Sequence, residues 1–291
     1  MKRLEQTYNS ISYFLANVIS SVASIAKILL LSDLEVRKQT TKGVKKCVIL
    51  GNGPSLAHSL IEYASILNKY QLIAVNSFAL TDEYTVLKPS YYVLHDPAFW
   101  TTEHDLPERV FNAIKLKTEW PIIIYIPSKA KKSKAIHKLT ADNIQIVFYN
   151  YTVYKGFKNL GHYFFKRNLA MPQSQNVMVA CLFLAINAGF RDIYILGADH
   201  TWHENLVVDD NNILCLKDVH FYDKGAEIKL KPFRKGLNVE ETFRVSEIFE
   251  VWSKVFRGYE TIAVYAKLKG ANIYNSSKIS FIDSFERRKL S

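Results

Sequence analysis

Cysteine is scarce in this sequence: its 291 residues include three, and Cys47, Cys181 and Cys215 form no CxxC pair. That spacing excludes a disulfide framework and makes a reducing cytoplasm the simplest compartment. Glycine and proline number only 11 and 8, and no internal repeat or low-complexity linker interrupts the chain. Because 48% of the residues are hydrophobic and 22% are charged, disorder, collagen-like repeats and coiled-coil arrays are excluded, and a folded core is expected.

Acidic residues are outnumbered: 27 Asp and Glu stand against 38 Lys and Arg, for a net charge of +11. A surplus of this size favours anionic partners such as nucleic acid, an acidic membrane face or phosphorylated substrates. The basic run from Lys129 to Lys134 lacks the interleaved aromatic residues of single-strand binders. We therefore expect no nucleic-acid partner.

One apolar run stands out near the N-terminus, at residues 10–31, with basic residues on both sides. A signal peptide, a spanning helix and an amphipathic helix are the three interpretations. No small-residue cleavage site follows the run, and polar residues recur every three or four positions: Ser10, Asn17, Ser20, Ser21, Ser24 and Lys27. This polar stripe favours an amphipathic helix in a membrane interface or on a partner. Residues 1–42 are thus expected to associate the protein peripherally with the cytoplasmic face of the inner membrane, whose anionic lipids suit the basic flanks.

From Lys45 onward, short apolar runs alternate with helical stretches. The apolar runs are typical of buried strands and lie at 47–50, 72–75, 91–94, 122–126, 144–149, 193–196 and 271–275. This alternation predicts an α/β fold with a doubly wound, mostly parallel Rossmann-like sheet, joined to the N-terminal amphipathic helix and a lid. We assign residues 43–199 to a nucleotide-binding domain, 200–238 to a lid or acceptor region, and 239–291 to C-terminal helices and a last strand.

The turn from Gly51 to Leu56, with sequence GNGPSL, is the sharpest local motif. Its glycines allow backbone N–H groups to approach a ligand, and Ser55 is expected to cap a helix that runs to about Lys69. The motif is neither GxGxxG nor a Walker loop, so a plain strand-to-helix turn is equally open. Polar residues end four of the predicted strands: Asn52, Asn76, Asp96 and Asp199. Because ligands bind beyond the carboxyl ends of parallel strands, these residues predict a nucleotide site.

Residues 200–238 are polar, aromatic and charged, as in a loop or lid over a site. His220 lies between Asp218 and Asp223, and acidic neighbours can hold one tautomer so that the imidazole acts as a general base. A plain surface histidine is the alternative.

A metal site is the other chemistry considered for this region. His200 and His203 have HxxH spacing, and Glu204 and the pair Asp209–Asp210 follow. No third ligand has convincing spacing, so we expect these residues to shape a polar pocket and no metal to be bound.

Several segments resemble, in order, those of the family 42 bacterial sialyltransferases: Val48–Leu56, Ala74–Phe78, Asp96–Phe99, Ser174–Val177, Gly189–Asp199 and Ile273–Ser277. The GPSL loop and the Asp-Pro at a strand end are also similar to the domain shared by flagellin nonulosonate transferases and archaeal hydroxymethylpterin diphosphokinases. The resemblance covers roughly residues 45–285. It implies a CMP-sugar donor that carries a nonulosonic acid such as sialic acid.

The resemblance also implies roles for individual residues. It assigns binding of the nucleotide and the donor sugar to ten residues: Asn52, Gly53, Ser55, Asn76, Asp96, Gln175, Asn176, Gly197, Asp199 and Ser276. It assigns the general base to His220, and Tyr222 is the substitute for two lid tyrosines of that family, near whose places Thr201 and Asn205 stand. Asp96 replaces an asparagine of the family and adds a negative charge near the donor.

The function expected from the sequence is therefore an inverting, metal-independent glycosyltransferase that needs no cofactor. It would move a sialic acid-like sugar from CMP to a glycan acceptor such as a cell-surface glycan or lipopolysaccharide, at the membrane surface. Two alternatives stay open: a Mg²⁺-dependent diphosphokinase of the hydroxymethylpterin type, and an inactive nucleotide-sugar-binding assembly protein. A homo-oligomer is compatible with the sequence.

Overall fold

A computed structural model describes residues 2–36, 40–41, 43–101, 105–218, 229–236 and 239–291. Its centre is an eight-stranded sheet with the order β13-β12-β6-β1-β2-β3-β4-β5, in which every neighbouring pair is parallel. The strands are β1 (Lys46–Leu50), β2 (Gln71–Val75), β3 (Tyr91–Val93), β4 (Ile122–Pro127), β5 (Ile144–Tyr149), β6 (Asp192–Leu196), β12 (Asn272–Asn275) and β13 (Glu286–Arg287). The predicted doubly wound, parallel α/β fold is confirmed.

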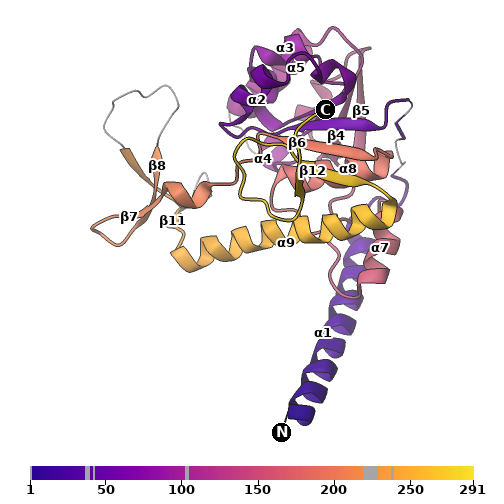
Figure 1. Ribbon diagram of the computed structural model, residues 1–291, viewed down its shortest axis with the longest axis vertical. Coiled ribbons are helices and arrows are strands. Elements are labelled where there is room, and N and C mark those ends of the chain that lie inside the picture. The colour runs from indigo at the N-terminus through magenta and orange to yellow at the C-terminus, as the bar shows by residue number, and fades with distance from the viewer. Residues whose placement is uncertain (1, 37–39, 42, 102–104, 219–228, 237–238) are drawn as a thin grey trace.

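Helices cover both faces of this sheet (Figure 1). On one face lie α2 (Leu56–Glu62), α3 (Glu83–Leu87), α4 (Ala98–Thr101), α5 (Asp105–Lys117) and α6 (Lys134–His137). On the other lie α7 (Lys158–Lys166), α8 (Val177–Ala188), α9 (Val245–Lys269) and the end of α1 (Lys2–Leu31). Four short 3₁₀ turns are also described, at Leu67–Lys69, Asn76–Leu80, Ser128–Lys132 and Trp202–Asn205.

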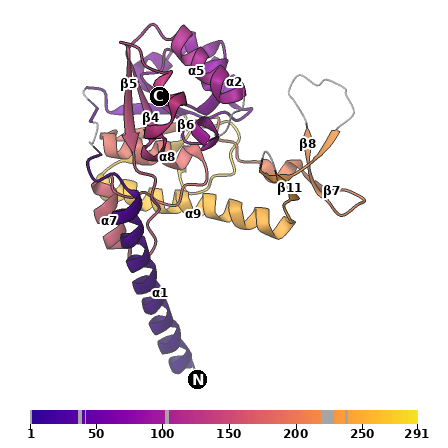
Figure 2. The same cartoon turned by 180° about the vertical axis from the view of Figure 1, so that it is seen from behind.

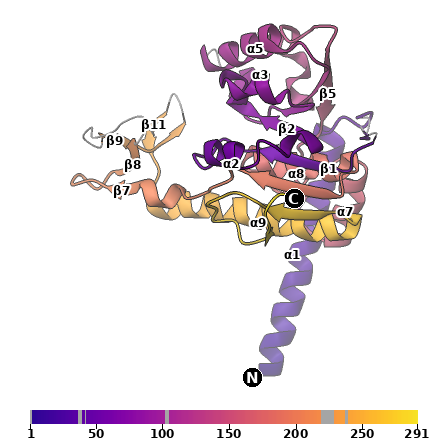
Figure 3. The ribbon, with the colours of Figure 1, turned by 45° about the horizontal axis from the view of Figure 1, so that its top comes forward.

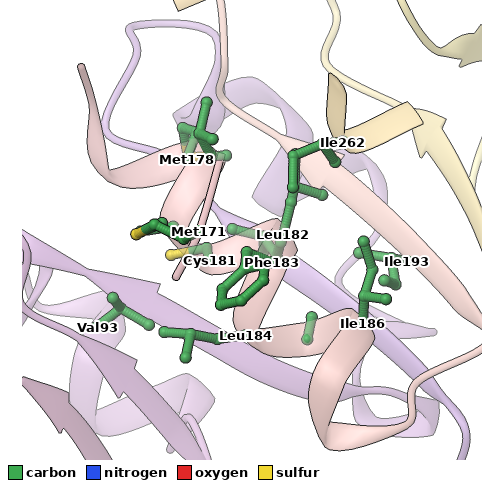
Figure 4. Close-up of a cluster of buried hydrophobic side chains, with 14 of the residues drawn as sticks. Val93, Met171, Met178, Cys181, Leu182, Phe183, Leu184, Ile186, Ile193 and Ile262 are labelled. Carbon is green, nitrogen blue, oxygen red and sulfur yellow. The ribbon is translucent and has the colours of Figure 1, made fainter. Parts of the chain in front are cut away.

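The strands are apolar throughout because successive side chains point to opposite faces and both faces are covered. In β1, Cys47 and Ile49 pack toward α8 and α9, whereas Val48 and Leu50 pack toward α2 and α5. Figure 4 shows the first of these cores, in which side chains of α8 contact β3, β6 and α9.

Helix α8 lies in the middle of that core. It is buried from Met178 to Ala188, which explains its apolar composition on all sides. The side chain of Asn176 caps its first turn by accepting the N–H of Val179, and Gly189 ends it in the left-handed conformation with φ +97°. Gly189 therefore ends the helix, and the Asn176 cap fixes its start at the edge of the sheet.

The region expected to be a lid contains strands instead of an open loop. The strands β7 (Leu206–Val208), β8 (Leu214–Asp218) and β9 (Lys229–Pro232) form an antiparallel sheet, and β10 (Arg234–Gly236) pairs with β11 (Val239–Thr242). Figures 2 and 3 show this unit extending away from the central sheet, beside the start of α9.

Three boundaries expected from the sequence were wrong. The helix after the GNGPSL turn ends at Glu62 and not near Lys69, and α9 begins at Val245 because residues 239–242 form a strand. The described residues 276–291 hold bends and β13, so α9 is not followed by a second C-terminal helix as was expected. The stretch 239–291 therefore contains one helix and three strands.

Helix α1 projects from the body, and its second half lies beside α7 (Figures 1 and 2). Its span Glu5–Leu31 is long and apolar enough to cross a membrane by length and composition, and 17% of its most apolar window is buried. One apolar helix near the N-terminus thus offers a means of membrane association.

Candidate functional site

The order of the strands reverses between β1 and β6, and a pocket lies beyond their carboxyl ends. The chain runs outward from β1 through β2, β3, β4 and β5, then returns to β6 on the other side of β1. This is the topological switch point at which ligands bind in doubly wound sheets. The cavity has a volume of about 330 Å³ and is lined by Gly51, Asn52, Gly53, Pro54, Val75, Asn76, Asn176, Val177, Met178, Gly197, Asp199, His200, Thr201, Trp202 and Asn205.

The loops after β1 and β6 pack tightly against each other beneath this pocket. A Cβ atom on Gly53 would lie 2.6 Å from the carbonyl oxygen of Gly197 and 2.8 Å from Oδ1 of Asp199. Gly197 has φ +65°, and a Cβ atom there would lie 2.7 Å from Cβ of Leu56. The glycines of both loops are therefore needed for this close approach.

Ser55 and Asp199 join the two loops. Asp199 accepts the backbone N–H of Ser55 at Oδ2 over 2.9 Å and its hydroxyl at Oδ1 over 2.5 Å. Both residues are buried, so these are charge-assisted hydrogen bonds shielded from water. The Ser55 hydroxyl therefore does not cap α2, contrary to our expectation.

Most backbone N–H groups of the GNGPSL turn donate hydrogen bonds to other groups of the protein. Gly51 donates to the carbonyl of Leu196, and Gly53 donates to that of Gly197, each over 2.8 Å. Because the Gly51, Gly53 and Ser55 amides all have partners within the protein, the alternative of a plain strand-to-helix turn fits them better than a phosphate cradle. Close packing of the two loops explains the glycines.

The N-terminus of α8 supplies the donors that the turn lacks. Val177 and Met178 in its first turn line the pocket, and Asn176 precedes them. The first amides of a helix have no partner within the helix, and the macrodipole makes this end positive. The pocket therefore has a positive helix end against one wall, which suits an anionic group of a ligand.

Asn176, His200 and Tyr259 form a buried network at the same wall. Nδ2 of Asn176 lies 3.0 Å from Nε2 of His200 and 3.1 Å from the hydroxyl of Tyr259, which is 2.7 Å from Nε2 of His200. The N-cap bond to Val179 occupies Oδ1 of Asn176, so Nδ2 must face the imidazole. Nε2 of His200 therefore accepts, and Nδ1 carries the proton of the neutral ring.

His200 is held in that neutral state by its surroundings. Burial lowers the pKa of His200 from 6.5 to about 4. Its backbone has φ +56°, which is uncommon for a residue other than glycine, and its ring lies 4.3 Å from that of Trp202 between centroids. At neutral pH this residue is thus an N–H donor at the pocket wall, positioned from β6, α8 and α9 together.

A second buried network supports Asn176 from the other side. His95, at the end of β3, contacts the hydroxyl of Tyr149 through Nδ1 over 2.7 Å and that of Ser174 through Nε2 over 2.9 Å. Ser174 donates to the carbonyl of Asn176, so its hydroxyl accepts from Nε2 of His95. Burial lowers the pKa of His95 to about 4, and the neutral imidazole fixes the segment that leads into α8.

The structure brings some of the residues assigned from the sequence to this pocket. Among the residues that it describes, the lining includes Asn52, Gly53, Asn76, Asn176, Gly197 and Asp199. Ser55 lies behind them, bonded to Asp199. Asn76 accepts the N–H of His95 at Oδ1 over 3.4 Å, and Asn52 donates to the carbonyl of Val75 over 3.3 Å.

Other assigned residues lie elsewhere or are not described. Asp96 is exposed and accepts the N–H of Ala98, Gln175 is exposed, and Ser276 lines a separate basic pocket near the C-terminus. His220 and Tyr222 lie outside the described residues, and their roles stay predictions.

Trp202 and Tyr259 were missed as site residues, and His200 was expected to shape a polar pocket but not to act as a donor there. His200 and His203 were considered together as metal ligands, but His203 packs on Phe281, 4.5 Å away between ring centroids. The available signal was the position of His200 directly after the strand-end Asp199. Tyr259 gave no signal, because its spacing in α9 is that of an ordinary core residue.

Carboxylates are sparse around the pocket. Asp199 is the one acidic side chain among the lining residues that the structure describes, and no Lys or Arg is among them. Across the described part of the chain, no three His, Cys, Asp or Glu side chains are grouped so that they would hold a metal ion.

The fold and the pocket define a doubly wound α/β protein with a ligand site at the switch point of a parallel sheet. The chain belongs to the MptE-like family: the family model described as 6-hydroxymethylpterin diphosphokinase MptE-like matches residues 17–205. Among solved structures, the chain is similar to the apo form of an alpha-2,3-sialyltransferase from Campylobacter jejuni, with 14% identity and a TM-score of 0.42 over 89% of this chain and 85% of that one. No curated protein sequence matches the chain.

Proposed function

We propose that the protein is a metal-independent, inverting glycosyltransferase that moves a nonulosonate-type sugar from CMP to a glycan acceptor. The observation that carries this proposal is the chemistry of the pocket wall. Three asparagines (Asn52, Asn76 and Asn205), the neutral His200 and the N-terminus of α8 provide uncharged donors. Such a wall suits a donor with a single phosphodiester and a carboxylate better than a highly charged triphosphate.

In the reaction, the bond between the sugar and the CMP oxygen breaks as the bond to the acceptor oxygen forms on the opposite face of the sugar. Negative charge then builds on the departing phosphate, where the first amides of α8 and Nδ1–H of His200 would stabilise it. His220 would take the proton of the acceptor hydroxyl, and Tyr222 would assist the leaving phosphate.

General-base catalysis is worth roughly 10²–10⁴ in rate. His220→Ala should therefore lower turnover by about that factor and leave CMP binding nearly unchanged. An equal loss of CMP affinity and turnover would exclude this role for His220.

Ligand preference tests the reaction class directly. In a thermal-shift screen with CMP, CDP, UDP, GDP and ATP, each with and without Mg²⁺, a ligand at 100 times its Kd stabilises the fold by about 2.7 kcal/mol. We expect CMP to raise the melting temperature, and we expect this rise to be the same with and without Mg²⁺. A shift with ATP and Mg²⁺ alone would refute the proposal.

The family match favours one second candidate, a diphosphokinase that transfers diphosphate from ATP to a pterin-like alcohol. Such a reaction relies on Mg²⁺ held by carboxylates. The described residues fit that ion poorly, because both oxygens of the lining carboxylate, Asp199, accept hydrogen bonds from Ser55. An inactive nucleotide-sugar-binding assembly protein would bind CMP in the same screen without turnover.

The acceptor that we propose is a cell-surface glycan or lipopolysaccharide assembled at the cytoplasmic face of the inner membrane. The exposed apolar helix α1 supports a peripheral association with that membrane. Removal of residues 1–41 should release the protein from membranes, and continued sedimentation with them would contradict the assignment.

A further inference from the structure

We propose that α1 lies flat in the interface of an anionic membrane, between the bilayer and the globular body, and that α7 makes a second contact with the lipid headgroups. The inference rests on the membrane association proposed above and is independent of the reaction. It adds what covers the polar stripe of α1, because Ser21 and Ser24 of that stripe face the protein.

The polar stripe binds the body through hydroxyl groups. Ser21 accepts the N–H of Phe157 over 3.0 Å and the hydroxyl of Tyr154 over 2.9 Å. Ser24 donates to the carbonyl of Lys155 over 2.8 Å and accepts the N–H of the same residue over 2.9 Å. Both serines are buried, so at these two positions α1 is closed to water and lipid.

The opposite face of α1 is apolar and exposed. Tyr8, Ile11, Leu15, Ile19 and Val22 follow one another at intervals of three or four residues and are between 53% and 72% exposed. A shift of nine residues is about two and a half turns, so Leu15 and Ser24 lie on opposite sides of the helix. A continuous apolar face thus runs along α1, away from the body.

The position of the body disfavours a spanning helix. The more apolar half of α1 is the half that carries the body, through Ser21, Ser24 and the buried Ile28. A spanning orientation would draw α7 and its lysines into the hydrocarbon. Spanning would also bury Asn9 and Asn17 of the first half of α1 in hydrocarbon, which is unfavourable. A flat helix leaves these side chains at the headgroup level.

Beside α1, the segment that contains α7 is basic and aromatic. Residues 151–171 include Lys155, Lys158, Lys166 and Arg167 and no Asp or Glu. Phe157 is partly exposed and contacts Phe14 of α1, with ring centroids 5.5 Å apart, and Arg167 lies 3.7 Å from the ring centre of the exposed Tyr163. Aromatic and basic side chains together are typical of a contact with anionic headgroups.

A second copy of the chain would be the other occupant of the apolar face. Helices that pair usually flank their seam with Glu and Lys. Between Gln6 and Leu31, α1 carries one charged residue, Lys27. The charge and composition of this surface therefore match an anionic bilayer better than another α1.

Depth measurements along α1 test the orientation. Single cysteines at Tyr8, Leu15, Val22 and Asn17 would carry an environment-sensitive fluorophore on full-length protein, bound to vesicles of phosphatidylglycerol and phosphatidylcholine. The native cysteines are buried, and burial raises the pKa of the Cys47 and Cys181 thiols, so brief labelling spares them.

The flat orientation predicts equal, shallow quenching by lipid-borne quenchers at positions 8, 15 and 22 and little at position 17. A depth that changes steadily from position 8 to position 22 would overturn the proposal in favour of a spanning helix.

Charge and face variants provide matched comparisons. Ile19→Asn with Val22→Asn should lower vesicle binding at least tenfold, whereas Ala16→Asn, off the apolar face, should change it little. Lys158→Gln with Lys166→Gln should lower binding to anionic vesicles by about fivefold per charge, and Lys69→Gln with Lys115→Gln should not.

Two further outcomes would overturn the proposal. One is equal binding to purely neutral vesicles. The other is a dimer in solution that does not bind vesicles and that dissociates when Ile19→Asn is introduced. The apolar face would then pair two copies of the chain. The thermal shift with CMP, measured on the same samples without vesicles, separates failure of this inference from failure of the proposed reaction.

Discussion

Asn176 donates its side-chain N–H to Nε2 of His200 over 3.0 Å, and this bond decides what His200 does in the pocket. Its other amide atom, Oδ1, is occupied by the N–H of Val179, so the amide cannot rotate without uncapping α8. His200 consequently presents a protonated Nδ1. A ring in that state donates to an anionic ligand and cannot serve as the base, which must come from another residue.

Removal of the His200 imidazole should weaken donor binding. A hydrogen bond to a charged group is worth about 1.5–3 kcal/mol, so His200→Ala is expected to raise the Kd for CMP by roughly 10- to 100-fold in calorimetric titration. His203→Ala is the matched control, because His203 lies three residues away and packs on Phe281 outside the pocket lining. Equal effects of the two substitutions would contradict a specific role for His200.

Stability should fall as the pH drops below the normal pKa of histidine. Burial lowers the pKa of His95 and His200 to about 4, so between pH 6.5 and 4 the unfolded chain binds more protons than the folded one. From pH 7.5 to 4.5 the free energy of unfolding should fall by roughly 2–3 kcal/mol per histidine in urea titrations.

Replacing one histidine by glutamine separates its contribution to the pH dependence of stability from that of the other titrating groups. His95→Gln should show a shallower loss of stability over the same range, because one depressed pKa is gone. If its slope matched that of the original protein, His95 would not be the neutral buried group that the geometry describes.

The bond between Ser55 and Asp199 should be a coupling between the two loops of the pocket. A double-mutant cycle with Ser55→Ala and Asp199→Asn is expected to give an interaction energy of about 1–3 kcal/mol in chemical unfolding. Asp199→Asn should be the more damaging single change, because it also weakens the bond from the Ser55 amide. Additive effects would show that the two side chains act independently.

The strands were predictable because buried parallel strands need apolar residues on both faces. Runs such as Cys47–Leu50 and Ile193–Leu196 therefore stand out, and the polar residues that end them mark the edge where the pocket lies. Asn52, Asn76 and Asp199 could thus be placed near one another from these strand ends, whereas Asp96, placed by the same rule, is exposed and does not line the pocket.

The partners of the loop amides could not be predicted. The glycines of GNGPSL fit a phosphate cradle and a tight turn equally well, and the choice depends on Gly197, which lies far along the chain. The strand Val239–Thr242 could not be predicted, because its single apolar residue gives no alternation of apolar and polar positions. A local sequence pattern does not show which distant residue will bond to a loop amide. It also does not show the residue at which a strand ends and a helix begins.

The polar stripe of α1 illustrates the same limit. Ser21 and Ser24 recur at helical spacing, which indicates a face but not what lies against it. Their partners are backbone groups of Lys155 and Phe157, more than 130 residues away. The sequence therefore predicted an amphipathic helix but not that the protein itself covers part of its polar stripe.

Loss of these hydroxyl groups should loosen α1 from the body without unfolding the central sheet. Ser21→Ala with Ser24→Ala removes both serine hydroxyls and leaves the backbone groups of Lys155 and Phe157 unpaired, so we expect faster tryptic cleavage after Lys27 and a Tm lower by about 2–4 °C per kcal/mol lost. Ser10→Ala is the control, because that hydroxyl donates to Gln6 within α1. Cleavage at the same rate in the double variant and the control would show that the serines do not hold the helix, and the flat orientation on a membrane would lose its geometric basis.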